Sequence, residues 1–238
     1  MNLVIDIGNS GTKLAVYSED KKTIVLRGDN TEIEKKLSEY KFKNAIISTV
    51  KSTIDAIAEK LTIRIPFVHY LSYKSRLPFI IEYDTPETLG SDRIAAVAGA
   101  YLYYPGADVL IIDAGTAITY EFLSGKYYNG GNISPGLYMR FKALNKFTGR
   151  LPLVKPADIF TSPGKNTSDA IIAGVLNGII YEINEYIRAF QKKYPQAKVI
   201  LTGGDGDYLK GRIGNPLVSY MPDLVLDGLN FILECNAK

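Results

Sequence analysis

Short apolar runs bounded by turn-forming residues recur along this chain. The segments 3–5, 44–50, 109–113 and 198–202 each contain consecutive Val, Ile or Leu residues, and each leads into polar or small residues. Such runs are typical of buried strands. The segment 12–18 follows the first run after a glycine-containing turn, so the two predict a β-hairpin.

Longer segments between these strands keep helical spacing. From 169 to about 194, apolar residues recur at every third or fourth position. A second helix is expected over 85–104, because this segment opens on Thr-Pro-Glu and ends at Pro-Gly. Shorter helices are expected over 52–61 and 225–233. Strands and helices that alternate in this way predict an α/β fold.

Two stretches of the sequence share one pattern. "DIGNSGTK" begins at Asp6 and "DAGTAIT" begins at Asp113, and each places an acid at the end of an apolar strand, then a glycine, then a second strand. The two acids are 107 residues apart (113 − 6), close to half of the 238-residue chain. A repeat at this distance predicts a duplicated domain, with one copy over 1–110 and the other over 111–238.

The first of these turns suits a phosphate group, but it is neither of two familiar phosphate loops. A P-loop needs a wider glycine spacing with Ser or Thr after its lysine, and a dinucleotide fingerprint needs three glycines that open a helix. A hairpin turn can instead offer backbone N–H groups and hydroxyls to phosphate. An ordinary hairpin would contain the same residues, so the local sequence leaves both interpretations open.

Composition narrows the function classes. Hydrophobic residues make up 46% and charged residues 22% of the chain, as in a soluble globular protein. The single cysteine, Cys235, and the single histidine, His69, exclude an internal disulfide and a cluster of Cys or His ligands. The net charge of +3 gives no argument for nucleic acid or a membrane, and no apolar run approaches the roughly 18 residues of a membrane span. We therefore expect a cytoplasmic protein.

Six motifs, in a fixed order over nearly the whole chain, carry a family resemblance. They are "DIGNSGTK" at 6–13, "LGSDR" at 89–93, "DAGTAIT" at 113–119, "GGNISPG" at 130–136, "GKNT" at 164–167 and "LTGGD" at 201–205. With them the chain resembles the type III pantothenate kinases of the actin, sugar kinase and Hsp70 nucleotide-binding superfamily. It departs from the common family pattern at Ser91, where Ala is usual, at Glu121, where an Asp is usual and the charge is kept, and at 171–174.

The resemblance implies an α/β fold of duplicated actin-like (ribonuclease H-like) domains. Each domain would be a mixed sheet flanked by helices, with nucleotide in the cleft between the two. The domain over 1–110 would carry the first phosphate hairpin. The domain over 111–238 would carry the second hairpin and a glycine turn on the nucleotide side, at Gly203 and Gly204.

The resemblance also assigns ATP and hydrated Mg²⁺ to the first hairpin. The residues it gives to the ATP phosphates are Asp6, Ile7, Gly8, Asn9, Ser10, Gly11, Thr12 and Lys13, joined by Thr116 of the second hairpin. Asp6 would hold Mg²⁺ through water, and Mg²⁺ keeps several waters, so one or two carboxylates suffice. The position of Lys13 in a strand is compatible with a phosphate contact and with plain surface exposure.

Asp92 is the expected catalytic residue of this resemblance, as the acceptor of the alcohol proton. It falls in the first turns of the expected helix over 85–104, beside Arg93, and both surroundings favour an ionised carboxylate. Because an ionised Asp is a weak base, its role would be to orient the hydroxyl and to accept the proton late. From this segment alone, an acid that caps the helix is the more common interpretation.

Pantothenate is the substrate that the resemblance implies. The residues assigned to it are Tyr83, Gly90, Ser91, Asp92, Arg93 and Thr167. Arg93 would offer a fork of donors to the pantothenate carboxylate or hydroxyls. Asp113, the acid of the second hairpin, would hold a monovalent cation, K⁺ or NH₄⁺, although the residues alone do not separate this role from Mg²⁺ coordination.

Two other functions are compatible with the same residues. A kinase of another small alcohol would keep the same hairpins, and a non-catalytic nucleotide-binding transcriptional accessory factor would keep the same fold. The presence of Asp6, Asp92 and Asp113 favours an enzyme. The resemblance further implies a homodimer, and the long apolar helix over 169–194 could supply part of its interface.

Overall fold

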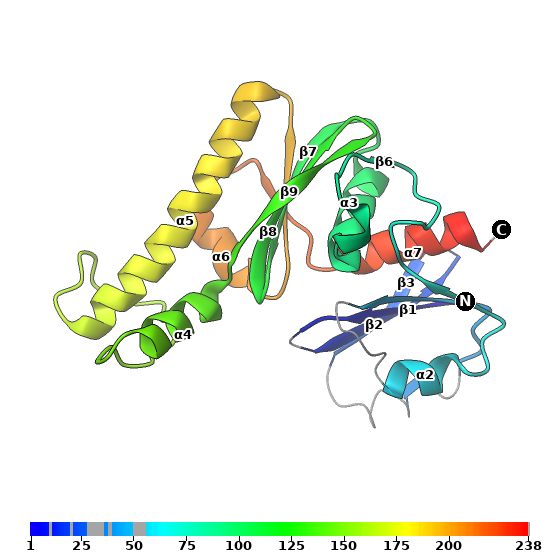
Figure 1. Cartoon of the computed structure of the whole chain (residues 1–238), viewed down its shortest axis with the longest axis horizontal. Helices are drawn as coiled ribbons and strands as arrows, with labels where there is room; N and C mark the ends of the chain where they lie inside the picture. The colour runs from blue at the N-terminus through cyan, green and yellow to red at the C-terminus, as the bar shows by residue number, and fades with distance from the viewer. Residues whose placement is uncertain (10, 20, 28–35, 38–39, 50–55, 238) are drawn as a thin grey trace. The chain divides into compact units, whose positions relative to one another are not determined.

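The computed structural model describes residues 1–9, 11–19, 21–27, 36–37, 40–49 and 56–237. Contacts divide the chain into two compact units (Figure 1). The first unit consists of Met1–Ala107, Leu123–Gly130 and Asp223–Lys238, and the second of Asp108–Phe122 and Gly131–Pro222.

The first unit contains a five-stranded mixed sheet. Its strands are β1 (Asn2–Ile7), β2 (Thr12–Ser18), β3 (Lys21–Arg27), β4 (Asn44–Thr49) and β5 (Phe67–Tyr70), in the order β3-β2-β1-β4-β5. The strands β1, β2 and β3 run antiparallel in succession, whereas β4 is parallel to both β1 and β5. The predicted hairpin of the first apolar run with segment 12–18 is therefore confirmed.

A second sheet repeats this order. Its strands are β6 (Ile80–Ile81), β7 (Asp108–Ala114), β8 (Ala117–Ser124), β9 (Tyr127–Pro135), β10 (Lys198–Thr202) and β11 (Val218–Tyr220). The order is β11-β10-β7-β8-β9-β6, and β10 is parallel to both β7 and β11. Only two residues separate β7 from β8 and β8 from β9, so these pairs are antiparallel hairpins, because a parallel connection needs a crossover of about a dozen residues.

Both sheets thus have three strands in antiparallel succession followed by two parallel strands on the side of the first. This shared order is the structural form of the half-length repeat. The α/β fold with two mixed sheets flanked by helices is confirmed. The helices are α2 (Ala56–Thr62), α3 (Ser91–Tyr103), α4 (Leu137–Phe147), α5 (Thr167–Lys193), α6 (Gly206–Ile213) and α7 (Leu224–Asn236), with a 3₁₀ turn at Pro86–Thr88.

The expected helix over 85–104 differs from the structure in one respect. A 3₁₀ turn occupies Pro86–Thr88, Leu89 is extended, and α3 begins only at Ser91, with Gly90 as its N-cap. The Thr-Pro-Glu start signal is thus satisfied by a single 3₁₀ turn. As a consequence, Asp92 lies in the first turn of α3, where the free N–H groups of a helix face an anion.

The other expected elements agree with the structure to within a few residues. The strand expected over 44–50 is β4, and Val50 lies outside the described residues, as does the start of the helix expected over 52–61. The last helix is longer than expected, because α7 runs from Leu224 to Asn236.

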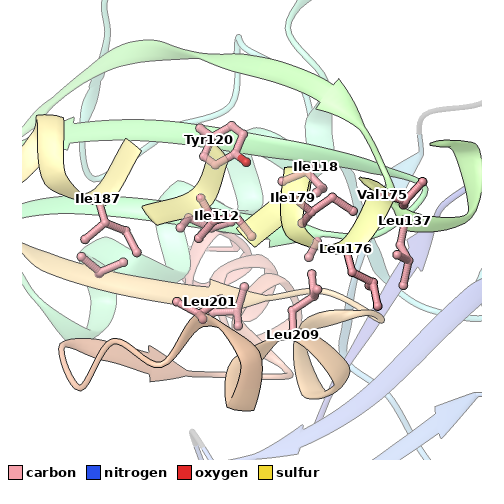
Figure 2. Close-up of a cluster of buried hydrophobic side chains, with 14 of the residues drawn as sticks. Ile112, Ile118, Tyr120, Leu137, Val175, Leu176, Ile179, Ile187, Leu201 and Leu209 are labelled. Carbon is pink, nitrogen blue, oxygen red and sulfur yellow. The ribbon is translucent and has the colours of Figure 1, made fainter. Parts of the chain in front are cut away.

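The core of the second unit lies between α5 and the strands of its sheet. Ile179, Ile183 and Ile187 of α5 are fully buried against Ile112 and Tyr120. Figure 2 shows these strand residues facing the helix, with Leu201 and Leu209 on the other side of the cluster. The spacing of apolar residues that predicted this helix is therefore the spacing of its buried face.

Both faces of β1 are buried within the first unit. Leu3, Ile5 and Ile7 belong to one apolar cluster, whereas the opposite face includes the fully buried Val4. A central strand that is buried on both sides is a continuous apolar run, as the sequence has it.

The helix α7 belongs to the first unit although it ends the chain. It crosses α3 where a side chain at Gly228 would overlap the backbone of Ala95, and Asp227 accepts hydrogen bonds from Tyr17 Oη (2.6 Å) and Lys22 Nζ (3.0 Å). The sequence division placed this segment with 111–238, whereas its contacts place it with the first unit. Among the described residues, no helix is both long and apolar enough to cross a membrane.

Candidate functional site

The first turn is an open connection between β1 and β2. The N–H of Gly8 donates to the carbonyl oxygen of Gly11 (3.0 Å), which closes the turn. A side chain built at Gly11 would meet nothing within 4 Å. Ser10 lies outside the described residues. The space beside Gly11 is therefore free for a ligand atom, as the phosphate interpretation requires.

Asp6 lies at the end of β1, with two polar neighbours across the sheet. In the pairing register it faces Lys13 on β2 and Ser48 on β4, and directly paired residues point to the same face. Burial raises the pKa of Asp6 to about 6; the charge of Asp92 adds to this rise, whereas Lys13 and a hydrogen bond with Ser48 oppose it. The ionised carboxylate is therefore short of positive charge, and a cation beside it would supply that charge.

Asp92 is held at the positive end of α3. Its Oδ1 accepts a hydrogen bond from the N–H of Arg93 (2.8 Å). This contact and the helix dipole favour negative charge on the side chain. Because Asp92 also acts electrostatically on Asp6, the structure brings the predicted base and the predicted metal-side acid into one neighbourhood of the first unit.

A pair of buried hydroxyls lies between β4 and the start of α3. Ser48 Oγ lies 3.0 Å from Ser91 Oγ, and Ser91 Oγ donates to the carbonyl oxygen of Thr49 (3.0 Å). Ser48 is fully buried and Ser91 is 8% exposed. Ser48 thus contacts Asp6 on one side and the first residue of α3 on the other. It was not among the predicted site residues, although parallel pairing of its strand with β1 would have suggested it.

Arg93 and Tyr83 form the third part of the first-unit site. The guanidinium carbon of Arg93 lies 5.7 Å from the centre of the Tyr83 ring. Arg93 is buried and Tyr83 is half-buried. Stacking over an aromatic face stabilises a guanidinium and fixes the direction of its donors. Five of the predicted substrate residues, from Tyr83 to Arg93, therefore lie together in this unit.

The second turn, in the second unit, is closely packed. The N–H of Gly115 donates to the carbonyl oxygen of Ala117 (3.0 Å), and the N–H of Gly136 donates to that of Thr116 (3.2 Å). A side chain at Gly136 would overlap the carbonyl oxygens of Gly115 and Thr116. The end of β9 is thus pressed against the turn that contains Thr116.

Another glycine packs against the acid of this hairpin. Gly203 has a φ of +92°, and a side chain there would overlap the carboxylate of Asp113 and the carbonyl oxygen of Ala114. The N–H of Asp205 donates to that same carbonyl oxygen (2.9 Å). The "LTGGD" motif therefore lies against "DAGTAIT". Thr167 is the first residue of α5, behind the N-cap Asn166, and is exposed.

The donor set suits a hard cation held largely by water. Within the part of the chain that the structure describes, no group of three or more His, Cys, Asp or Glu could hold a metal ion. The buried carboxylate of Asp6, with Asp92 close enough to act on its charge, is compatible with a hydrated Mg²⁺, because Mg²⁺ retains several waters and needs only one or two carboxylates in phosphate-binding sites.

Two mixed sheets of the same strand order, flanked by helices, form an actin-like α/β fold that solved structures of putative sugar kinases share. The solved structure of a putative N-acetylglucosamine kinase from Porphyromonas gingivalis has this fold. It superposes with a TM-score of 0.50 at 12% identity, over 97% of this chain and 99% of that one.

This chain belongs to the type III pantothenate kinase family, whose model matches residues 2–189. A Bacteroides fragilis protein named type III pantothenate kinase is 45% identical, over 99% of this chain and 98% of its own length. A solved structure from Campylobacter jejuni, described as a conserved putative Baf family transcriptional activator, is 27% identical. Its TM-score is 0.61, over 99% of this chain and 98% of that one. Membership of a kinase family implies ATP as the phosphoryl donor.

Proposed function

We propose that this chain transfers a phosphoryl group from ATP to an alcohol of pantothenate, the first step of coenzyme A biosynthesis. The observation that carries the proposal is the placement of Asp92 in the first turn of α3, held by the N–H of Arg93, in a chain of the type III pantothenate kinase family. Phosphoryl transfer requires charge compensation at the phosphates and an aligned, deprotonated alcohol, and this set of side chains can supply both.

Asp92 accepts the proton of the attacking hydroxyl. Its carboxylate is fixed by the Arg93 N–H and by the end of α3, so it orients the hydroxyl before the proton moves. Arg93 binds the pantothenate carboxylate through its fork of donors, and Tyr83 holds the guanidinium in place. Gly90 and Ser91 shape the start of α3, and Thr167 binds the same substrate from the start of α5.

The first turn, with Ile7 to Lys13, holds the ATP phosphates through backbone N–H groups and hydroxyls. Asp6 holds Mg²⁺ through water, and this ion offsets the negative charge of the phosphates when it is bound. In the second unit, Asp113 holds a monovalent cation, K⁺ or NH₄⁺, and Thr116 hydrogen-bonds the nucleotide. Asp113 fits this role because its hairpin also offers carbonyl oxygens, the ligand type of such cations.

We also propose a homodimer that acts in the cytoplasm. The second unit exposes large apolar side chains on α4 and α5, among them Tyr138 at 55%, Phe147 at 79% and Tyr181 at 70%. Apolar area of this kind is typical of a surface that a second copy covers.

The test is the release of ADP from MgATP, with and without pantothenate, in K⁺, NH₄⁺ and Na⁺ buffers. We expect turnover that requires pantothenate and is faster in K⁺ or NH₄⁺ than in Na⁺, with a product heavier than pantothenate by one phosphoryl group. A panel of other small alcohols separates a pantothenate kinase from a kinase of another acceptor.

A nucleotide-binding transcriptional accessory factor is the second candidate, favoured by the likeness to the Campylobacter jejuni structure. Such a protein would bind ATP but would not turn over with pantothenate. That result would contradict the kinase proposal directly, whatever the affinity for nucleotide.

A further inference from the structure

Arg140 of α4 binds the end of β9 at several points. Its Nε donates to the carbonyl oxygen of Pro135 (2.8 Å), and its Nη2 donates to Ser134 Oγ (2.9 Å). Its own N–H donates to the carbonyl oxygen of Gly136 (3.0 Å). The side chain thus fixes two consecutive residues, Ser134 and Pro135, and its planar fork is needed to reach both at once. The bond to Gly136 is the backbone bond that opens α4.

Glu182 of α5 also holds the guanidinium. Its Oε2 accepts from Arg140 Nη2 (2.6 Å), and its Oε1 accepts from Tyr120 Oη (2.8 Å). Burial would raise the pKa of Glu182, but hydrogen bonds with Arg140, Tyr120 and Ser134 outweigh it and leave the pKa lowered. The Tyr120 ring is itself stacked on Tyr186, with ring centres 3.9 Å apart. Arg140 is therefore anchored to the core of the second unit.

The segment that Arg140 fixes packs directly against the second turn. Gly136 donates to the carbonyl oxygen of Thr116, and it approaches so closely that only a glycine fits. A displacement of Pro135 and Gly136 would therefore be transmitted to Gly115 and Thr116. Because interiors are close-packed, such a turn shifts with its neighbour instead of absorbing the change.

We propose that Arg140, held by Glu182, is a positioning residue that sets the second turn for nucleotide binding. It acts through Ser134, Pro135 and Gly136 and does not itself contact the nucleotide. The proposal rests on the proposed role of Thr116 in nucleotide binding, and it deepens that role by naming what holds the turn.

The test compares two matched Arg→Lys variants on purified full-length protein. Arg140→Lys keeps a positive charge opposite Glu182 but loses the fork, so Pro135 and Ser134 are no longer held together. Arg188→Lys is the control, because Arg188 pairs with Glu185 on α5 at 2.5 Å and is largely exposed. Calorimetric titration with MgADP in K⁺ buffer gives the nucleotide affinity, and thermal unfolding shows that each variant is folded.

We expect Arg140→Lys to weaken MgADP binding about tenfold, since residues that act through others modulate affinity on this scale. The KM of Arg140→Lys for pantothenate should stay within about twofold of the wild-type value. Arg188→Lys should match the wild type in both MgADP affinity and KM. Glu182→Gln keeps one acceptor oxygen, which can still face Arg140, while its NH₂ group would face the Tyr120 hydroxyl in place of the second carboxylate oxygen. A smaller loss, about threefold, is therefore expected.

Unchanged MgADP affinity in a folded Arg140→Lys protein would overturn the positioning role. So would an equal loss of nucleotide and pantothenate binding together with a lower melting temperature, because that pattern marks general destabilisation. The binding readout also keeps the two proposals apart. A wild type that binds MgADP but does not phosphorylate pantothenate contradicts the proposed function alone, and the Arg140 comparison then still stands or fails on affinity.

Discussion

The two hairpin turns share a strand order but are held in different ways. The first turn is open, with free space beside Gly11, and its acid, Asp6, is surrounded by ionisable and hydroxyl side chains. The second turn is packed by glycines, with Gly136 on one side and Gly203 on the other. Duplication thus preserved the backbone, whereas the surroundings diverged. We infer that the first turn serves the chemistry, and that the second serves a fixed binding geometry.

Removal of the base in the first unit should have the largest effect. Asp92→Asn keeps the size of the side chain but cannot accept the proton, so kcat should fall about a thousandfold, in the range of general-base contributions. The KM values should change little. Steady-state ADP release measures both.

Asp207→Asn is the matched control, since Asp207 is the acid in the first turn of α6 and is largely exposed. The kcat of this variant should stay within about twofold of the wild-type value. If Asp92→Asn retained more than a tenth of the activity, the cap interpretation of Asp92 would be the correct one.

The packing of the second turn gives the next largest effect. Gly203→Ala introduces a Cβ at a φ of +92°, against Asp113 and Ala114, and should lower the free energy of unfolding by about 3 kcal/mol. Gly204→Ala is the control one residue away, where a Cβ meets nothing within 4 Å, and should be neutral within about 1 kcal/mol. Urea unfolding measures both variants. If the two variants were equally stable, the second turn would accommodate an added side chain as readily as the first turn does.

The sequence was informative where a local pattern decides the structure. The apolar runs predicted β1, β4, β7 and β10, and the spacing of apolar residues predicted α5. The break before α3 was missed because a Thr-Pro-Glu start suits a 3₁₀ turn as well as a helix. The strand β9 was not assigned, since its glycines and asparagines are turn-forming residues. Pairing with its neighbours overrides that preference.

The site residues also divide into those that local motifs predict and those that only tertiary packing brings together. Asp6 and Asp92 belong to motifs, and the structure brings them into one neighbourhood. Ser48 was missed because its role depends on the parallel register of β4 with β1, which no local pattern fixes. Arg140 was missed because its contacts depend on where α4 and α5 lie against β9. Neighbours that are distant in sequence are set by tertiary packing, and one sequence carries no direct record of it.

The charge of Asp6 should have a smaller effect on the free energy of unfolding, and this effect depends on pH. The folded-state pKa of Asp6, about 6, exceeds its ordinary value of 3.8, so the folded protein binds this proton more tightly than the unfolded chain. The contribution of Asp6 to stability is therefore most favourable below about pH 4 and is lost as the pH rises through 6. In metal-free buffer at pH 7.5, Asp6→Asn should raise the free energy of unfolding by about 2 kcal/mol.

That gain should disappear near pH 4, where the wild-type side chain is largely protonated in the folded state. Urea unfolding of both proteins at the two pH values measures the difference, and Asp84→Asn, at an exposed site, is the control. A gain that is the same at both pH values would show that burial of the charge is not its cause. The variant should also lose activity, because it lacks the carboxylate proposed to hold Mg²⁺.

The hydroxyl pair of the first unit should give the smallest effect. Ser91→Ala removes the donor to Thr49 and the partner of Ser48, which should lower the free energy of unfolding by about 1 kcal/mol. Thr62→Val is the matched control, since Thr62 is 7% exposed and its hydroxyl donates to the carbonyl oxygen of Ala58 (2.7 Å). Both variants should lose similar stability in urea. Only Ser91→Ala should also lower kcat, about threefold, because its hydroxyl ties the turn of Asp92 to the strand beside Asp6. If kcat is unchanged in both, Asp6 and Asp92 are held by backbone packing, as the second turn is, and the contrast between the two turns is confined to their glycines.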